Sequence, residues 1–175
     1  PNRFQDTCRF YEQSIRSYMH FDNLFEYAYF LQQHNQHNEA ERYYQEAMKR
    51  FGSELDAPTR AMTLNNLGNS QSDKNEFEDA LKSYKEALEI YRKLAQTNSQ
   101  AYLPYVAITL INLSVFYQEC QPDKDVSVQY AMEALKILTP FLERVPYTKQ
   151  YTLAALQVLL TWGVDIEKIL AGEDK

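Results

Sequence analysis

The chain has 175 residues, a length that suits one compact domain or about four two-helix repeats. With 4 Gly and 6 Pro it has too few turn formers for an all-β protein, and a hydrophobic fraction of 45% argues against disorder. The 18 Lys and Arg against 24 Asp and Glu give a net charge of −6 without a basic stripe. This balance argues against nucleic acid and anionic membranes as partners and mildly favours a neutral or basic protein or peptide.

The first two segments predict a lone helix followed by a helix pair. Residues 6–20 form the leading helix, with Phe10, Ile15 and Tyr18 available to cover the next pair, and His20 as a capping residue. In residues 22–52, apolar side chains recur at spacings of three and four, which places them on one face of each helix of the pair. The first helix contributes Leu24, Tyr27, Ala28 and Leu31, and the second contributes Ala40, Tyr44 and Ala47.

The same pattern returns forty residues later and twice more along the chain. In residues 57–97, small Gly68 and Ala80 let two helix backbones approach closely, while larger side chains fill the surrounding space. Residues 100–143 predict a third pair, and residues 147–171 a partial fourth pair or a cap. The members of the packing sets are Leu64, Leu67, Gly68, Gln71, Ala80, Tyr84 and Ala87; Leu110, Leu113, Ser114, Tyr117, Ser127, Ala131 and Ala134; and Leu153, Leu156, Gln157 and Leu160.

These residues resemble the tetratricopeptide repeat family over roughly residues 22 to 162. The chain departs from the family pattern at Leu64, Gln71 and Arg92, where Trp, an aromatic residue and Pro are common. Residues 63–68 and the extended stretch 87–95 are similar to the longer-helix branch, as in kinesin light chains and bacterial tandem arrays. The resemblance implies an all-α fold, a right-handed α-solenoid of antiparallel helix pairs forming one domain over residues 1–175, and a protein-interaction scaffold as the function.

In such a stack the first helices line a concave groove, and side chains next to the packing set point into it. An Asn side chain both donates and accepts hydrogen bonds, so it can satisfy a peptide backbone of any sequence. Two alternatives stay open: the Asn residues bond to neighbouring helices or water, and the aromatic residues pack on the leading helix. The predicted groove residues are Phe25, Tyr29, Asn65, Asn66, Asn69, Ile111, Asn112, Val115 and Val158.

Several kinds of chemistry are not expected. These groove positions hold no cation, so a clamp for a terminal carboxylate is not predicted. His34 and His37 have a spacing that could serve a metal, but no third ligand accompanies them in their polar connector. The sequence has no phosphate loop, nucleophile elbow or HExxH motif. We therefore expect no enzyme activity, no cofactor and no metal.

Other features bear on location and on a second hypothesis. Two distant cysteines, Cys8 and Cys120, do not make a disulfide framework, which suggests a reducing, cytoplasmic location. The uncharged stretch 101–118 contains Pro, Thr, Asn and Ser and is expected to be a buried helix rather than a membrane span. No signal peptide opens the chain, and it lacks an initiator Met, so we expect a processed product or a segment of a longer protein. The alternative function is a structural, regulatory or self-associating segment of a larger signalling protein, with contacts between copies through the C-terminal repeat.

Overall fold

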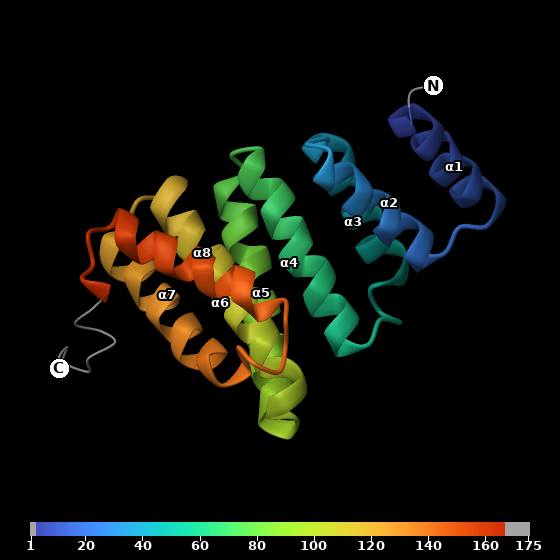
Figure 1. Ribbon diagram of the computed structural model, residues 1–175. Coiled ribbons are helices and arrows are strands. Elements are labelled where there is room, and N and C mark those ends of the chain that lie inside the picture. The colour runs from blue at the N-terminus through green and yellow to red at the C-terminus, as the bar shows by residue number, and fades with distance from the viewer. Residues whose placement is uncertain (1–2, 167–175) are drawn as a thin grey trace. The chain divides into compact units, whose positions relative to one another are not determined.

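A computed structural model describes residues 3–166, and within that range the chain is all-α, with no strand (Figure 1). The elements are α1 (Arg3–Ser17), α2 (Phe21–Gln33), α3 (His37–Phe51), α4 (Ala57–Asp73), α5 (Phe77–Thr97), α6 (Ser99–Glu119), α7 (Lys124–Leu138), the short 3₁₀ helix η1 (Thr139–Phe141) and α8 (Thr148–Thr161). The chain forms two compact units, Pro1–Ser83 (unit 1) and Tyr84–Lys175 (unit 2), whose boundary falls within α5. Each unit is described separately.

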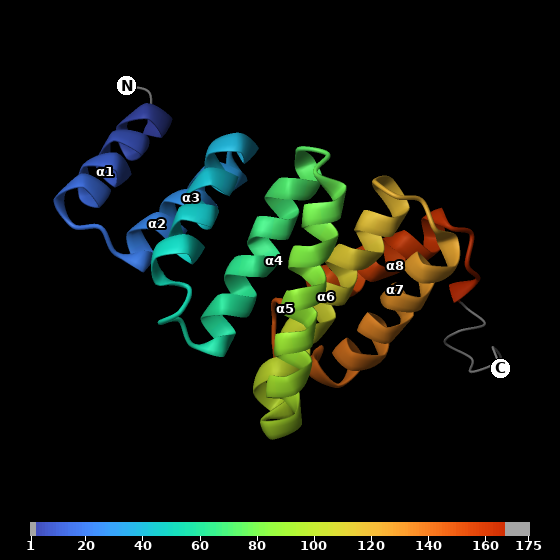
Figure 2. The same ribbon diagram turned by 180° about the vertical axis from the view of Figure 1, so that it is seen from behind.

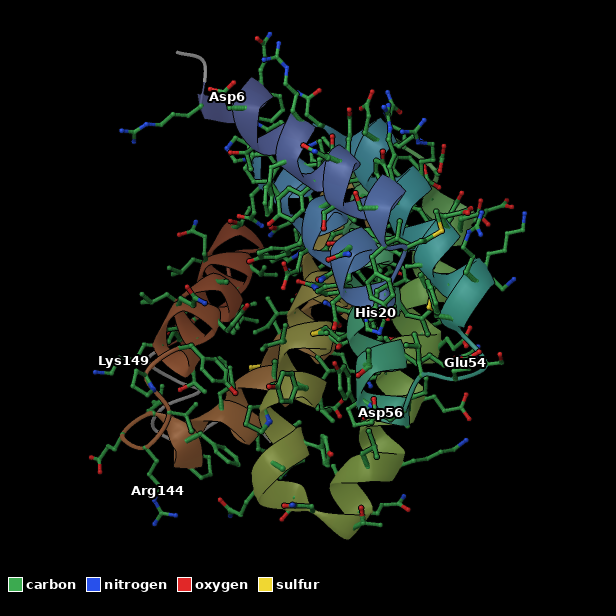
Figure 3. The ribbon with its side chains drawn as sticks, turned by 90° about the vertical axis from the view of Figure 1, so that its right-hand side faces the viewer. Asp6, His20, Glu54, Asp56, Arg144 and Lys149 are labelled. Atoms are coloured by element: carbon green, nitrogen blue, oxygen red, sulfur yellow. The ribbon has the colours of Figure 1, made fainter. Side chains whose placement is uncertain are left out.

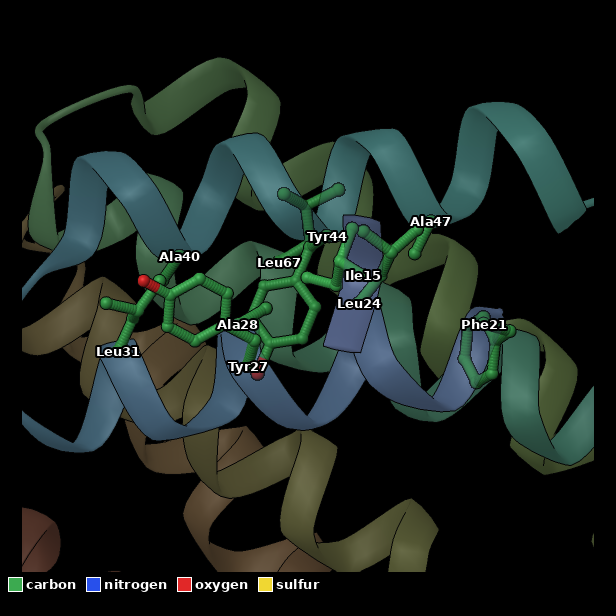
Figure 4. Close-up of a cluster of buried hydrophobic side chains, with 10 residues drawn as sticks. All are labelled: Ile15, Phe21, Leu24, Tyr27, Ala28, Leu31, Ala40, Tyr44, Ala47 and Leu67. Atoms are coloured by element: carbon green, nitrogen blue, oxygen red, sulfur yellow. The ribbon is translucent and has the colours of Figure 1, made fainter. Parts of the chain in front are cut away.

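Unit 1 is built on the predicted face of α2 and α3. α1 packs on α2, α2 on α3, and α3 on α4 (Figure 2). Ala28, Ala40 and Ala47 have no exposed surface, which lets the helix backbones approach, and Tyr44 fills the space beside them. The predicted packing set is therefore confirmed in this unit. The complete cluster in Figure 4 comprises Ile15, Phe21, Leu24, Tyr27, Ala28, Leu31, Ala40, Tyr44, Ala47 and Leu67.

The leading helix differs in part from the prediction. It begins at Arg3, and Phe10 and Tyr18 are 66% and 69% exposed, so these two do not cover the first pair. The covering face instead carries Phe4, Cys8, Tyr11 and Ile15, which pack on the core cluster. Their spacings of four, three and four place them on one side of a helix. His20 does cap a helix, since its side chain accepts a hydrogen bond from the Asp22 N–H at the start of α2.

The turns after α2, α4 and α8 share one geometry. Asn35 and Asn75 adopt left-handed backbone angles, with φ of 58° and 64°. Asn tolerates this region better than other residues with a side chain, and Gly163 occupies it after α8 with φ 71°. In each turn the following N–H bonds back over five residues, as from Glu76 to Gln71 at 2.9 Å. The polar connectors thus end one helix and start its antiparallel neighbour.

Unit 2 packs α6 on α7, and α8 on both (Figure 1). Where earlier pairs place Gly or Ala, this pair places Ser114 and Ser127. Each hydroxyl donates to the other residue's backbone carbonyl at 2.8 Å, so two buried polar groups are satisfied across the helix contact. Asp123 begins α7 by accepting a hydrogen bond from the Val126 N–H at 3.1 Å, which explains this acidic residue as a helix cap.

The register of α8 differs from the prediction. Leu153 and Leu160 are 66% and 57% exposed, whereas Ala155 and Leu159 are fully buried. In the first three repeats the C-cap lies ten residues after the first packing leucine, in the pairs Leu24 and His34, Leu64 and Lys74, and Leu110 and Cys120. The C-cap of α8 is Trp162, so the same spacing of ten residues places the first packing position of α8 at Thr152 rather than at Leu153. The predicted cap extends to residue 171, and residues 167–171 lie outside the described part.

Candidate functional site

In unit 1, one side of α2 (Phe25 and Tyr29) and one side of α4 (Met62, Asn66 and Asn69) carry exposed or half-buried side chains, which we call together the unit 1 face. Phe25 is half-buried, with its ring 5.6 Å from Tyr44 in an edge-on contact. Tyr29 and Met62 are 47% and 37% exposed. Phe25 therefore packs on Tyr44 of α3, whereas the alternative interpretation places it on the leading helix, and Tyr29 stays accessible to a partner.

An amide network fixes Asn66 within the unit 1 face. Gln32 Nε2 donates to the Asn66 carbonyl oxygen at 2.9 Å and to Ser70 Oγ at 3.0 Å. The Tyr44 hydroxyl donates to Gln32 Oε1 at 3.3 Å. Burial raises the pKa of Tyr44, and a hydrogen bond from the Asn66 side chain partly offsets that rise. Asn66 thus contributes to the contact between α2, α3 and α4, whatever else it binds.

The other predicted Asn residues are also engaged within the chain. Asn65 is 8% exposed and belongs to the packing of α4, whereas Asn69 and Asn112 are half-buried. All three take part in interactions with other groups of the protein. Peptide binding by Asn66, Asn69 and Asn112 stays a prediction, and it requires that a partner compete for or extend their existing interactions.

In unit 2, two of the predicted apolar groove residues are buried and one is half-buried. Ile111 and Val158 are each 2% exposed, so the structure assigns them to packing rather than to an open surface. Val115 and Asn112 are half-buried on α6, in one stripe with Tyr105. Positions 105, 112 and 115 recur at helical spacing, which places them on one side of α6.

Sequence reasoning missed a tyrosine cluster in unit 2. Tyr105 of α6 stacks on Tyr91 of α5 with ring centroids 5.4 Å apart. Tyr147 precedes α8, and its ring lies 6.5 Å from that of Tyr151. Burial is the main cause that raises the pKa of Tyr147, and the nearby Tyr105 and Tyr151 raise it further. Tyr147 also hydrogen-bonds Tyr105. With Tyr105 and Tyr147 40% and 41% exposed, this is an aromatic surface. The count of 14 Tyr was its one signal in the sequence.

The comparisons with known proteins agree with this geometry. The tetratricopeptide repeat family model matches residues 21–93, which cover α2 to α4 and most of α5. Residues 21–93 are thus similar to tetratricopeptide repeats. Among solved structures, BtubC (BKLC) from P. vanneervenii matches with a TM-score of 0.73 and 20% identity over 93% of this chain and 67% of that chain. At that identity the likeness shows the fold alone. No curated protein sequence matches the chain.

The polar connectors of the tetratricopeptide repeats hold close contacts between ionisable side chains. His37 Nδ1 lies 2.9 Å from Asp73 Oδ2, between the start of α3 and the end of α4. Lys74 Nζ pairs with buried Glu41 and lies 2.6 Å from Glu76 Oε1. Hydrogen bonding to Glu41 and then Glu76 raises the pKa of Lys74. Within residues 3–166, no group of three or more His, Cys, Asp or Glu could hold a metal ion.

One helix of this repeat protein has the length and apolar character of a membrane span. Within the described residues it is α6, whose most apolar 18-residue window has a mean hydropathy of 1.2. Half of that window is buried inside the protein, where α6 packs on α7 and α8. Such a match is weak evidence for a span, because the core helix of a soluble protein passes the same test.

Proposed function

We propose that this chain binds a protein or peptide through the exposed stripes of its first helices. Tetratricopeptide repeats are generally protein-interaction scaffolds, and no catalytic role is included in the proposal. The observation that carries the proposal is the exposure of large side chains on successive first helices: Tyr29 and Met62 in unit 1, and Tyr105 in unit 2. Tyr is enriched in protein interfaces because it offers a large, stiff apolar area with a polar tip.

Each unit offers its own chemistry to the partner. The unit 1 face combines Tyr29 and Met62 with the amides of Asn66 and Asn69, which suits a polar backbone next to an apolar side chain. In unit 2 the surface is formed by Tyr105 and Tyr147. A neutral or basic partner, which the net charge of −6 mildly favours, and a cytoplasmic location remain part of the proposal.

Site-specific photo-crosslinking tests the proposal. A photoreactive phenylalanine analogue replaces Tyr29, Tyr105 or, as a matched control, Phe10, which is 66% exposed on α1 outside the first helices of the pairs. The captured protein is identified and then measured with purified Tyr29→Glu and Tyr105→Glu variants. We expect crosslinks at Tyr29 and Tyr105, and at least about tenfold weaker binding by these variants. Equal crosslinking at Phe10, or undiminished binding by both variants, contradicts the proposal.

A second candidate function is self-association through α8. Leu153 and Leu160 lie seven residues apart on one side of this helix, with 66% and 57% of their surface exposed. Exposed apolar patches of this kind mark interaction sites in soluble proteins. Sedimentation velocity over a hundredfold concentration range tests this candidate, with Leu153→Lys/Leu160→Lys as the comparison. A monomer at every concentration excludes it, whereas association that the double variant abolishes supports it.

A further inference from the structure

A cavity of about 360 Å³ lies in unit 1 at the junction of α1, α2 and the start of α3, apart from the exposed stripes of α2 and α4. Cavities that bind small groups begin at about 300 Å³, so this one has room for a single extended side chain. It combines aromatic and aliphatic surface with amides and carboxylates. Its lining residues are Phe4, Gln5, Cys8, Arg9, Glu12, Tyr27, Leu31, Gln36 and Glu39.

The aromatic part of the cavity is rigid. The Tyr27 ring stacks on Tyr11 with centroids 5.2 Å apart, and lies 4.7 Å from the ring of Tyr43. Tyr27 is 3% exposed, so its position is set by the core. The neighbouring Tyr43 ring does not line the cavity, and the guanidinium carbon of Arg42 lies 4.8 Å from its centroid.

Two carboxylates line the cavity, and one of them is held by an aromatic side chain. The Tyr27 hydroxyl donates to Glu12 Oε1 at 3.3 Å, which orients the carboxylate of half-buried Glu12. Glu39 lies in the first turn of α3 and is exposed. Arg9 is the one cation among the lining residues, and its guanidinium lies 3.6 Å from Asp6 on the same helix. With Arg9 paired to Asp6, two carboxylates remain to balance an incoming charge.

We propose that this cavity binds an arginine or lysine side chain of a partner protein. Phe4, Tyr27 and Leu31 give the apolar stem of such a side chain a wall to pack on, while Glu12 and Glu39 supply charge-assisted hydrogen bonds to its cationic end. The amides of Gln5 and Gln36 can bond the partner's backbone. The site uses α1 and the opening turn of α3, so it is independent of the first-helix surfaces proposed above. A variant that no longer binds a partner through the first-helix surfaces can therefore still bind an arginine or lysine side chain in this cavity.

An NMR titration with a minimal probe tests the proposal. Acetyl-arginine-amide is added to the ¹⁵N-labelled protein, and acetyl-citrulline-amide serves as the neutral probe of nearly the same shape. We expect saturable shifts of the Gln5, Cys8 and Gln36 amide signals with the arginine probe, and at least about tenfold weaker binding of the citrulline probe. Equal binding of the two probes, or shifts spread over unit 1 without saturation, overturns the proposal.

Matched variants separate the cavity from general acidity. Glu12→Gln keeps an acceptor for the Tyr27 hydroxyl while removing the charge, and Glu39→Gln removes the second charge. Glu54→Gln is the control, because Glu54 is exposed in the α3–α4 loop and does not line the cavity. Figure 3 labels Glu54 in that loop and Asp6 near the start of α1. We expect about three- to fivefold weaker arginine binding for each cavity variant, and no change for the control. An equal loss with Glu54→Gln, or none with the cavity double variant, contradicts the site.

A chemical readout is available inside the cavity. Cys8 lines it, so in a Cys120→Ser background a maleimide reports on access to the site. Saturating acetyl-arginine-amide is expected to slow the labelling of Cys8 at least about threefold, and acetyl-citrulline-amide to leave the rate unchanged. An arginine-independent labelling rate places the probe elsewhere and overturns the assignment.

Discussion

The indole N–H of Trp162 donates to the hydroxyl oxygen of Ser127 at 2.9 Å, joining the end of α8 to the first turn of α7. Ser127 also donates to the backbone carbonyl of Ser114 on α6. One buried hydroxyl therefore connects three helices of unit 2. This bond shows that Trp162 packs within the unit.

Replacing Ser127 by Ala is expected to destabilise unit 2 by about 1–3 kcal/mol, because the half-buried indole N–H and the Ser114 carbonyl both lose a partner. Trp162 is the one tryptophan of the chain, so its fluorescence reports directly on the contact. Urea denaturation followed by this fluorescence measures the loss. The control is Gln129→Ala, which changes an exposed side chain two residues further along the same helix. Equal stability of the two variants would show that the Trp162 bond contributes nothing.

The sequence predicted the first two helix pairs well because their packing residues are sharply periodic. Ala40, Tyr44 and Ala47 stand among charged neighbours, so one helical register fits them. In α8 the apolar residues lie on nearly every side, from Leu153 to Leu160, and periodicity could not decide which face is buried. Residues from distant helices that converge, such as the tyrosine cluster, leave no pattern along the chain.

The side chain of Gln32 connects α2 to both α3 and α4 through hydrogen bonds. Its amide bonds the Asn66 carbonyl and the Ser70 hydroxyl of α4, while its oxygen accepts from Tyr44. We expect Gln32→Ala to lower the free energy of unfolding by about 1–3 kcal/mol, because partly buried polar groups on α3 and α4 lose their partners. Thermal and urea denaturation provide the measurement.

The adjacent Gln33 offers a matched control for this change. It is exposed at the last position of α2, and Gln33→Ala is expected to alter stability by less than about 0.5 kcal/mol. Similar losses in both variants would mean that helix propensity, rather than the amide network, determines the effect. In that case Asn66 would have no fixed role in the repeat contact.

The ion pairs at Lys74 predict a pH dependence of stability. A hydrogen bond from Lys74 lowers the pKa of Glu76, although burial partly opposes this. A lowered pKa in the folded state adds stability above the unfolded pKa of about 4.3, and that stability is lost as the pH falls through the folded value. For Lys74, whose pKa is raised, the contribution is present below about pH 10.4 and is lost as the pH rises further.

Glu76→Gln tests the acidic side of this window. We expect it to be less stable than the natural sequence by about 0.2–1 kcal/mol at about pH 6 to 8, because Glu76 is partly exposed. The difference should shrink as the pH falls from about 5 to about 3. Denaturant midpoints across this range provide the measurement, with the exposed Glu78→Gln in the first turn of α5 as control. A difference that grows at low pH would have the wrong sign for this ion pair.

The register of α8 leads to the sharpest comparison, since one substitution can be made on both faces of the same helix. Leu159→Ala removes a side chain with no exposed surface and should cost about 2–5 kcal/mol through lost burial and a cavity. Leu153→Ala removes a side chain that is 66% exposed and should change the stability of the monomer by less than about 1 kcal/mol. Urea denaturation at low protein concentration, where association is absent, gives both values. If Leu153→Ala proves the costlier change, the face predicted from the sequence is the buried one, and α8 is rotated relative to the position described here.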